Sequence, residues 1–433
     1  MIKNQIDLIT LGCSKNLVDT EHLMRQLQAV GYAVKHDAEK ANGEIVVINT
    51  CGFIGDAKEE SIDMILQFAQ KKSKKKIKKL FVMGCLSERY LKELSVEIPE
   101  VDKFYGKFNY NELIKDLGKE FHSDLSLQRN ITTPSHYSYV KIAEGCNRTC
   151  SYCAIPLITG KYQSRPMEDI EEEIKWLVSQ GVKEFQLIAQ DLSYYGFDRY
   201  KGLKLAELTN RLADIKGVEW LRLHYLYPAG FPTDLFKVMR ERENVCNYLD
   251  IALQHISDNM LKKMRRGVSS QQTYELVKML RCEVPDIHIR TTLLLGHPGE
   301  TEDDVEELKT FIREMRFERL GAFAYSDEEG TYSNLHYDDN IPYEIKQQRV
   351  SEIMKIQQQI SLEINQQKIG KSFKIIVDSL DDDYYIARSE YDSPEVDTEI
   401  LINRADGELL IGEFYTAKII GAEEFDLYAQ IQK

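Results

Sequence analysis

The sequence predicts an α/β protein in three parts: an N-terminal doubly wound parallel sheet, a central partial (βα)6 barrel and a small antiparallel β-barrel at the C-terminal end. Two observations favour this architecture. Apolar strand-like runs alternate with helical segments along most of the chain, and beyond Gly370 short alternating β-segments replace them. At ~150 residues per domain, 433 residues suggest about three domains. We expect these domains at residues 1–125, 135–365 and 369–433.

The first third of the chain has a βα rhythm. Strands are predicted at 6–11, 44–49 and 80–83, with helices at about 17–30 and 55–69 and from about 87. This rhythm predicts a parallel sheet with helices on both faces. Seven lysines stand in the nine positions from Lys71 to Lys79, and we favour a solvated helix C-terminus over an RNA-binding patch. The polar, aperiodic segment at about 118–134 is expected to be a linker.

The middle of the chain repeats the rhythm six times. The predicted strands are 139–143, 184–189, 220–227, 248–253, 287–295 and 320–325, with helices between them such as 167–180 and 271–280. Six such repeats predict a curved parallel sheet or partial barrel, with its site at the C-terminal ends of the strands. A long polar helix is expected at 344–367.

The last segment has short strands and an acidic composition. Strands are predicted at 373–377, 384–388, 399–402 and 415–420. From Gly370 to Lys433 there are fifteen Asp and Glu but only six Lys and Arg, a net charge of −9, and the whole chain carries −14. Such a protein is a poor general nucleic-acid binder, and a basic protein partner suits it better.

Composition excludes several other classes. With 43% hydrophobic and 29% charged residues, the chain is neither disordered nor collagen-like. No apolar run reaches the ~18 residues of a membrane helix, and Asp7 interrupts the N-terminal segment where a signal peptide would be apolar. We therefore expect a cytoplasmic protein without membrane contact. Eight cysteines are too sparse for a disulfide scaffold, and clustered cysteines in a reducing compartment more often bind metal or do redox chemistry.

Three cysteines lie within eight residues directly after a predicted strand: Cys146, Cys150 and Cys153, in the pattern CxxxCxxC. Structural zinc normally takes four ligands, and a [4Fe–4S] cluster usually takes four cysteines. With three, one iron stays open for a chelating substrate. Three buried thiols are the alternative, but the tight spacing favours the cluster.

A second group of cysteines is dispersed in the sequence. Cys13, Cys51 and Cys85 each follow a predicted strand of the N-terminal sheet, and each is adjacent to a glycine. Because the carboxyl ends of parallel strands line one edge, the three thiols could converge. Any one of them alone is more often a small buried hydrophobe. Together they predict a second three-cysteine cluster, so six cysteines are the expected metal ligands and catalytic residues.

The pattern CxxxCxΦC, with the aromatic Tyr152 before the last cysteine, resembles the signature of the radical S-adenosylmethionine (SAM) superfamily. This resemblance implies a partial (βα)6 barrel and a [4Fe–4S] cluster whose open iron chelates the amino and carboxylate groups of SAM. It also implies one-electron cleavage of SAM to a 5′-deoxyadenosyl radical, which abstracts a hydrogen from an unactivated carbon.

The N-terminal cysteines and the last domain resemble the methylthiotransferase family, which ends in a TRAM barrel, so the resemblance covers essentially the whole chain. The family implies two [4Fe–4S] clusters, the N-terminal one associated with sulfur transfer. It implies that a C–H bond becomes C–S–CH₃, with SAM as both methyl donor and radical source. It further implies an electron donor, such as flavodoxin or ferredoxin, and a sulfur source.

One branch of the family modifies a tRNA adenosine, and another modifies an aspartate β-carbon of small-subunit ribosomal protein S-twelve. Segments 134–139, 189–196, 222–228 and 388–397 resemble the ribosomal-protein branch. The acidic last domain agrees, because a tRNA enzyme would be expected to carry a basic barrel there. We therefore expect the ribosomal protein as substrate. A tRNA methylthiotransferase and a non-catalytic iron–sulfur electron-transfer scaffold are the alternatives.

The resemblance also implies residues that contact SAM. Besides Tyr152, Gln190 and Asp191 end a strand where family members contact the amino-acid part of SAM, although Asp191 could instead cap a helix. Gly296 and Gly299 lie in a segment that resembles the superfamily's glycine-rich SAM-binding segment, or form an ordinary turn.

The remaining candidates are expected to be structural. The arginines Arg222, Arg265 and Arg266 could face carboxylates, although surface salt bridges are the default expectation for each. Burial is expected for the thiols Cys246 and Cys282. His136, His255 and His297 are expected to support the fold rather than to bind metal.

Overall fold

The structure is a computed structural model that describes residues 1–38 and 41–432, and its chain divides into two units. The first unit consists of Met1–Thr133, Tyr139–Arg148 and Cys153–Trp176. The second consists of Pro134–Ser138, Thr149–Tyr152 and Leu177–Lys433. Within the described residues, no helix has both the length and the apolar character needed to span a bilayer.

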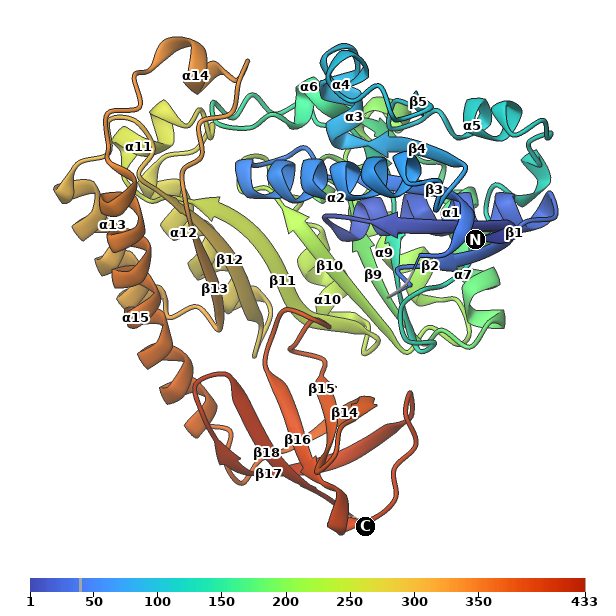
Figure 1. The fold of residues 1–433 in the computed structure, drawn as a ribbon. Coiled ribbons are helices and arrows are strands. Elements are labelled where there is room, and N and C mark those ends of the chain that lie inside the picture. Colours follow the sequence, from blue (N-terminus) through green and yellow to red (C-terminus); the bar gives the residue numbers. More distant parts are fainter. Residues whose placement is uncertain (39–40, 433) are drawn as a thin grey trace. The chain divides into compact units, whose positions relative to one another are not determined.

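A five-stranded parallel sheet forms the centre of the first unit (Figure 1). In spatial order its strands are β2 (Ala33–His36), β1 (Ile2–Thr10), β3 (Gly43–Thr50), β4 (Lys79–Gly84) and β5 (Lys103–Phe104). The strand β1 lies inside the sheet, with β2 next to it on one side and β3 on the other. This is the doubly wound topology that the sequence predicted. The strands β2 and β5 were not predicted, because both are short and lie at the edges.

Helices cover both faces of this sheet. They are α1 (Ser14–Ala29), α2 (Gly55–Ser73), α3 (Cys85–Arg89), α4 (Leu91–Glu97) and α5 (Tyr110–Asp116). Successive residues of β3 explain the arrangement: Ile45 and Val47 pack with α1 and α5, while Val46 and Ile48 pack with α2, α3 and α4. A strand buried on both faces therefore has a continuous apolar sequence rather than an alternating one. Lys71 and Lys72 stand in the last turn of α2, as expected for a lysine run at a helix C-terminus, but the helix ends at Ser73 rather than at about residue 69.

The segment expected to be a linker packs against the first unit instead. It contains a short 3₁₀ helix, Ser123–Leu125, and the fully buried Arg129. The Arg129 guanidinium lies 2.6 Å from the Glu21 carboxylate and 3.1 Å from that of Glu173. The Thr132 N–H donates to the other oxygen of Glu21 at 2.6 Å. One arginine in a polar stretch gives no periodic signal, so the sequence did not predict this packing.

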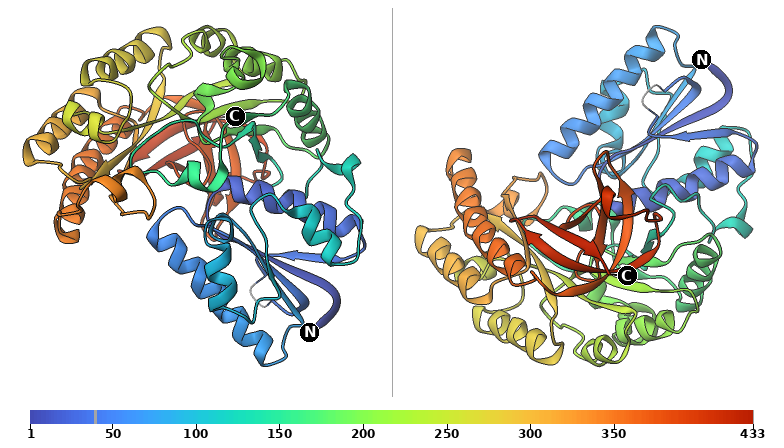
Figure 2. Two further views of the ribbon diagram at one scale, coloured as in Figure 1. Left: turned by 90° about the horizontal axis from the view of Figure 1, so that it is seen from above. Right: turned by 90° about the horizontal axis from the view of Figure 1, so that it is seen from below.

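The second sheet has six strands, which run in sequence order from one edge to the other. They are β6 (Tyr137–Lys141), β9 (Glu184–Ile188), β10 (Trp220–Leu226), β11 (Val245–Gln254), β12 (His288–Leu295) and β13 (Arg319–Ala324). The neighbouring strands from β9 to β13 are parallel. Sequential parallel strands joined by helices form the expected partial (βα)6 barrel, and the helices follow the outer side of the curved sheet (Figure 2).

The connections in this region are mostly helical. The helices are α6 (Ile155–Thr159), α7 (Met167–Ser179), α8 (Phe197–Tyr200), α9 (Leu205–Ala213), α10 (Leu235–Glu241), α11 (Asp258–Lys263), α12 (Ser270–Glu283), α13 (Glu302–Met315), α14 (Tyr332–His336) and α15 (Tyr343–Gln366), with the 3₁₀ helix η2 (Leu192–Tyr194). A separate antiparallel pair, β7 (Ala143–Glu144) and β8 (Gln163–Ser164), lies in the first unit.

The C-terminal strands close into a small barrel, as the sequence predicted. Around the barrel they are β14 (Ser372–Leu380), β15 (Tyr384–Ser389), β16 (Glu399–Asn403), β18 (Asp426–Ile431) and β17 (Phe414–Ala422), and a 3₁₀ turn, Arg404–Asp406, follows β16. Every neighbouring pair is antiparallel except β16 and β18, which are parallel. The strand β18 was not predicted, and it supplies the contact that closes the barrel. The interior is apolar, with Ile375, Ala387 and Ile419 fully buried.

Buried ion pairs join this barrel to the second sheet within the same unit. Glu184, at the start of β9, accepts hydrogen bonds from Arg222 of β10 at 3.1 Å and from Arg388 of β15 at 2.7 Å. Arg388 also pairs with Asp378, whose other oxygen lies 2.7 Å from His136 Nε2. The surface salt bridge expected for Arg222 is therefore wrong, because its side chain is fully buried. His136 is structural, as expected.

Candidate active site

The three dispersed cysteines all stand at the same edge of the first sheet. Cys13 precedes α1 and follows β1, Cys51 follows β3, and Cys85 begins α3 directly after β4. Because β1, β3 and β4 are neighbours and parallel, their carboxyl ends lie side by side. The structure thus brings Cys13, Cys51 and Cys85 to one place, as the sequence predicted.

A close backbone approach makes this grouping possible. Gly12, with φ +92°, precedes Cys13, and a Cβ built there would lie 2.8 Å from the Cys51 sulfur. A side chain at this position would occupy the space of the thiol, so glycine is required both for its conformation and for its size.

Asn16 of α1 holds the three cysteine-bearing loops in register. Its buried amide donates to the carbonyls of Leu11 and Thr50, each at 3.0 Å, and its side-chain oxygen lies 3.5 Å from the Cys85 sulfur. It therefore connects the ends of β1 and β3 to the start of α3. Sequence reasoning missed Asn16, because nothing but its position three residues after Cys13 marks it.

Burial raises the pKa of the Cys51 thiol, and it raises that of Cys85 to about 12, opposed by the nearby Lys107 ammonium. Cys13 raises the pKa of both thiols further, as expected for thiols that lie close together. Metal binding requires thiolates, and the positive charge of a metal centre offsets the cost of crowding them. Three convergent thiols of this kind fit an iron–sulfur cluster.

Behind Cys85 lies a buried network of four charged side chains within the first unit. The Lys107 ammonium is 3.1 Å from the Glu144 carboxylate and 3.9 Å from that of Asp19. Lys141 forms ion pairs with both acids. Glu144 stands two residues before Cys146, so the network connects the surroundings of Cys85 to the start of the second cysteine group. No feature of the sequence marked Lys107.

The second cysteine group divides between the two units. Cys146 and Cys153 belong to the first unit and Cys150 to the second, and all three are partly exposed. The Cys146 N–H donates to the carbonyl of Gly160 at 3.1 Å, and the Arg148 N–H lies 3.4 Å from the Cys146 sulfur. Their role as the ligands of a cluster with an open iron stays a prediction from their spacing in the sequence.

Cys150 has a buried cation beside it. The Arg266 guanidinium lies 3.2 Å from the Cys150 sulfur and 3.1 Å from the Tyr152 hydroxyl, and it covers the ring of Tyr227 at 4.1 Å. The Tyr227 hydroxyl is itself 3.5 Å from the same sulfur. The surface salt bridge expected for Arg266 is wrong, because the side chain is buried. A guanidinium in this position stabilises negative charge on the Cys150 sulfur.

His297 fixes the neighbouring residue of the same loop. Its Nε2 lies 3.1 Å from the Ser151 hydroxyl and 2.7 Å from that of Ser333. Burial lowers the pKa of His297 to about 4, so the ring is neutral at physiological pH. His297 therefore has the expected structural role, and the segment that it supports is the cysteine loop.

Gly296 and Gly299 flank this histidine, both with positive φ. The Gly296 N–H donates to the Glu300 carboxylate at 2.8 Å, and a Cβ on Gly296 would lie 2.3 Å from Cγ of Lys346. At Gly299 the obstacle would be the Lys263 ammonium. The segment after β12 is therefore a tight turn that side chains approach closely.

Gln190 and Asp191 lie just beyond β9, which ends at Ile188, and they are placed differently from each other. The buried Asp191 accepts a hydrogen bond from the Ser193 N–H at 2.9 Å and caps η2, the alternative role considered for it. Gln190 directly precedes it and is half-buried. Their contact with SAM stays a prediction.

Two further cysteines lie outside both groups. Cys246 is buried as expected, whereas Cys282, on α12, is exposed, so burial was the wrong expectation for it. His255 is buried beside Glu300 at 3.4 Å and accepts from the Ile256 N–H, a structural role as expected.

Among residues 1–38 and 41–432, no three His, Cys, Asp or Glu side chains are arranged to hold a single metal ion. Each cysteine of a four-iron cluster binds a different iron, so its ligands are spaced more widely than those of one ion. That the two cysteine groups bind iron–sulfur clusters stays a prediction.

Three family models match successive parts of the chain. Residues 5–106 match the Uncharacterized protein family UPF0004, residues 140–312 the Radical SAM superfamily and residues 369–431 the TRAM domain. The strands from β9 to β12 and the three cysteines from 146 to 153 fall within the second match, and the closed barrel falls within the third.

Curated relatives match over the full length. The chain is 65% identical over 431 residues to a protein of Phocaeicola vulgatus named ribosomal protein uS12 methylthiotransferase RimO, with 100% of each chain covered. It is 64% identical to the protein of the same name from Bacteroides thetaiotaomicron, with 100% of this chain and 99% of that one covered.

A solved structure shares the fold at low identity. The radical SAM methyltransferase TsrM from Kitasatospora setae, solved with tryptophan and a SAM analog, aligns with a TM-score of 0.55 and 14% identity. The alignment covers 74% of this chain and 72% of that one. This likeness agrees with the α/β fold class expected from the sequence.

Proposed function

Since the chain belongs to the family of ribosomal protein uS12 methylthiotransferases, as its sequence motifs indicated, we propose that it transfers a methylthio group to uS12 of the small ribosomal subunit. The bond formed joins sulfur to the β-carbon of an aspartate and replaces a hydrogen there. SAM serves both as the methyl donor and as the radical source. The observation that carries this proposal is the full-length match together with two separate groups of three cysteines.

Two [4Fe–4S] clusters would be held by the chain's own thiols: one by Cys146, Cys150 and Cys153, the other by Cys13, Cys51 and Cys85. When bound, the central cluster supplies the electron that cleaves SAM, and the N-terminal one serves sulfur transfer. The two different surroundings support this division of roles. Cys150 lies beside the Arg266 guanidinium, whereas Cys85 lies deep in the first unit beside Lys107.

The residues around these thiols would orient the cysteine loop and bind SAM. Arg266 donates to the Cys150 sulfur, the Tyr227 hydroxyl lies 3.5 Å from the same sulfur, and neutral His297 holds the adjoining Ser151. Tyr152, Gln190, Asp191, Gly296 and Gly299 would form the surroundings of SAM, which is supported by their position at the carboxyl ends of β9 and β12 and in the cysteine loop. For Asp191 this role would require its second oxygen, because the first caps η2.

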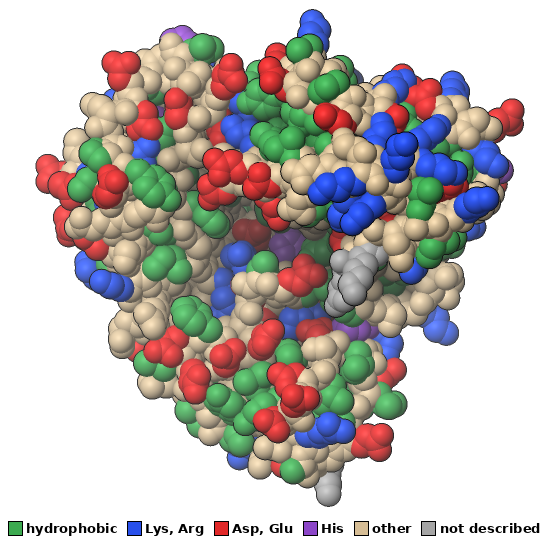
Figure 3. Space-filling model, in the orientation of Figure 1, with side chains coloured by type: hydrophobic (Ala, Val, Ile, Leu, Met, Phe, Trp, Pro, Cys, Tyr) green, Lys and Arg blue, Asp and Glu red, His purple; other side chains and the backbone are tan. Residues whose placement is uncertain are grey.

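We assign the roles to the segments expected from the sequence: 1–125 for the first cluster, 135–365 for radical generation and 369–433 for substrate recognition. The barrel presents exposed acids such as Asp381, Asp382 and Asp383, and Asp and Glu side chains are spread over the face of it visible in Figure 3. Acidic side chains complement a basic ribosomal protein and oppose a phosphate backbone. An electron donor such as flavodoxin or ferredoxin, a sulfur source and a cytoplasmic location complete the proposal.

Mass spectrometry tests the substrate directly. The anaerobically reconstituted full chain, incubated with SAM, a reductant and sulfide, should add one methylthio group to uS12 on small subunits and none to tRNA. Modification of tRNA in place of uS12 would replace this proposal with the tRNA alternative. SAM cleavage with neither product modified would contradict both.

Iron content tests the two clusters separately. The full chain should bind about eight irons by simple cluster stoichiometry, and the triple variant with Cys146, Cys150 and Cys153 changed to Ala about half of that. The first-group variant, with Cys13, Cys51 and Cys85 changed to Ala, should lose methylthiolation yet keep some cleavage of SAM to 5′-deoxyadenosine. Cys282→Ala, exposed and outside both groups, is the matched control and should change neither measurement.

A further inference from the structure

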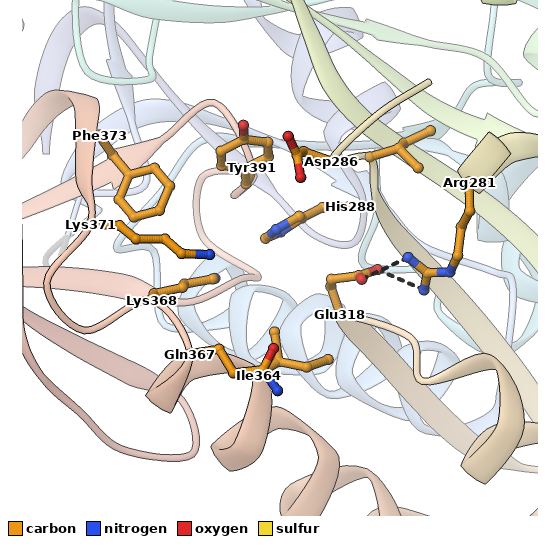
Figure 4. Close-up of a pocket in the computed structure, with 11 residues that line it drawn as sticks. Arg281, Asp286, His288, Glu318, Ile364, Gln367, Lys368, Lys371, Phe373 and Tyr391 are labelled. Carbon is orange, nitrogen blue, oxygen red and sulfur yellow. Dashed lines mark hydrogen bonds and ion pairs between the residues drawn. The ribbon is translucent and has the colours of Figure 1, made fainter. Parts of the chain in front are cut away.

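A cavity of about 410 Å³ lies in the second unit, where the central sheet meets the C-terminal barrel (Figure 4). Its walls come from the end of α12, the starts of β12 and β13, the end of α15, β14 and the loop after β15. It is lined by His288, the first residue of β12, whereas Gly296 of the candidate active site follows the last residue of that strand. The cavity is therefore a separate site, and its volume is typical of small-molecule sites.

Lys368 is the lining residue that most strongly indicates a ligand for the cavity. It stands just after α15 and is only 6% exposed. Within the described part of the chain, its ammonium forms no hydrogen bond and no ion pair, and Asp392, the acid that most favours its charge, is already paired with Arg319. Burial lowers the pKa of Lys368 to about 8. A buried cation without a partner costs free energy, and a bound anion would remove that cost.

The other polar groups of the cavity favour an anion as well. The Lys371 side chain extends into the cavity toward His288 (Figure 4), whose buried Nδ1 has no hydrogen-bond partner among the described residues. Arg281 and Glu318 form a two-point pair, at 2.9 and 3.2 Å, and neutralise each other. The remaining acid, Asp286, is exposed. Apart from the Arg281–Glu318 pair, the cavity is therefore lined by two ammonium groups, those of Lys368 and Lys371, and by one carboxylate, that of the exposed Asp286.

Aromatic rings form one wall of the cavity. The Tyr391 ring lies 4.3 Å from that of His288 at an interplanar angle of 30°, and Phe373 meets Tyr391 edge-on at 5.9 Å. The apolar Ile287 and Ile364 add to the lining. Such a wall suits a planar or apolar group attached to the anion.

We propose that this cavity binds a small organic anion, whose carboxylate or phosphate group pairs with Lys368 and Lys371 and whose planar or apolar body lies against Tyr391. None of the residues that line the cavity is one of the six cysteines or one of the residues proposed above to surround SAM.

Calorimetric titration of the full chain with three probes tests the proposal: benzoate, phenyl phosphate and the neutral benzamide. At least one of the two anions should bind at millimolar concentration or below, and the stronger of the two identifies the preferred headgroup. Benzamide should bind at least about tenfold more weakly, as expected from loss of a charge-assisted contact. Binding of benzamide as tight as that of the anions, or no binding of either anion, would overturn the proposal.

Variants of the lysines locate the site. Lys368→Met and Lys371→Gln should each weaken anion binding, the first by at least about tenfold. Lys355→Gln, an exposed lysine of α15 outside the cavity, is the matched control. Without a ligand, Lys368→Met should unfold at the same or a higher temperature than the parent chain, because it removes a buried unpaired charge. Undiminished anion binding by Lys368→Met would refute the assignment.

Discussion

At the scale of single residues, the cysteines were predictable and their neighbours were not. Spacing alone identified Cys146, Cys150 and Cys153, because three metal-binding side chains close in sequence must be close in space. Arg266 has no such signal: its role depends on a contact with Cys150 across more than a hundred residues. Sequence reasoning therefore assigned it to the surface, where most arginines lie.

Arg266 provides the prediction that belongs to this scale. Arg266→Gln removes a cation beside the Cys150 sulfur, so the reduced form of a bound cluster loses stabilisation. The midpoint potential of the central cluster should fall by up to about 65–130 mV, since hydrogen bonds to the sulfurs set such potentials and one to a charged group is worth about 1.5–3 kcal/mol. Redox titration followed by electron paramagnetic resonance measures the change.

A neighbouring residue supplies the control for that variant. Arg265 covers the ring of Tyr332 at 4.4 Å, so Arg265→Gln should leave the potential unchanged. Arg266→Lys should restore part of the shift, because it keeps the charge but loses the planar donor geometry. An unchanged potential in Arg266→Gln would mean that the guanidinium only supports the fold.

At the scale of helices and strands, apolar pattern predicted most of the core. The run at β3 and the six strands of the central sheet are long and apolar enough to stand out. The strands β2, β5 and β18 were missed because they are short or have polar residues at alternate positions, and their pairing is set by neighbours far along the chain. The buried ion pairs between elements were also missed, since charge in a sequence usually indicates exposure.

The pair between β9 and β15 can be tested by substitution. Glu184→Gln leaves the buried guanidinium groups of Arg222 and Arg388 without their shared carboxylate. The free energy of unfolding should fall by about 3–5 kcal/mol, the usual cost of removing one partner of a buried pair. Urea denaturation measures it. Glu219→Gln is the matched control, because Glu219 pairs with Lys374 at 3.4 Å on the surface, and it should cost less than about 1 kcal/mol.

The same carboxylate predicts a dependence of stability on pH. Burial alone would raise the pKa of Glu184, but Arg388 and Arg222 outweigh it and lower the value to about 2. Glu173, between Arg165 and Arg129, behaves in the same way. A carboxylate whose pKa is lower in the folded than in the unfolded state contributes its full stabilisation at pH values above its ordinary pKa. The contribution, up to about 3 kcal/mol for each, should be lost as pH falls from about 4.5 to 2.

Thermal unfolding followed across this pH range checks the prediction. The parent chain should lose stability steeply below pH 4.5, and Glu184→Gln should show a shallower slope, because one of the titrating groups is absent. Parallel slopes in the two proteins would indicate that other acids dominate the transition.

At the scale of the whole molecule, charge distribution bears on the choice of partner. Lysines gather on the first unit, in the run from Lys71 to Lys79, while the barrel is strongly acidic. Reversal of Asp381, Asp382 and Asp383 to Lys should weaken binding to uS12-containing small subunits, and the Asn triple variant should weaken it less. Sedimentation at several salt concentrations measures this, and the affinity of the parent chain should decline as salt rises. A salt-independent affinity, or equal loss in both variants, would contradict charge-based recognition.

The buried network around Glu184 has a consequence for protein engineering. It is tempting to treat a small terminal barrel as an exchangeable module and to redirect the enzyme by attaching the barrel of a relative. Here the barrel contributes Arg388, which neutralises Glu184 of β9, and Asp378, which accepts a hydrogen bond from His136. A transplanted barrel without these side chains would leave Glu184 without one of its buried partners at the interface. A chimera must therefore keep the interface residues as well as the recognition surface.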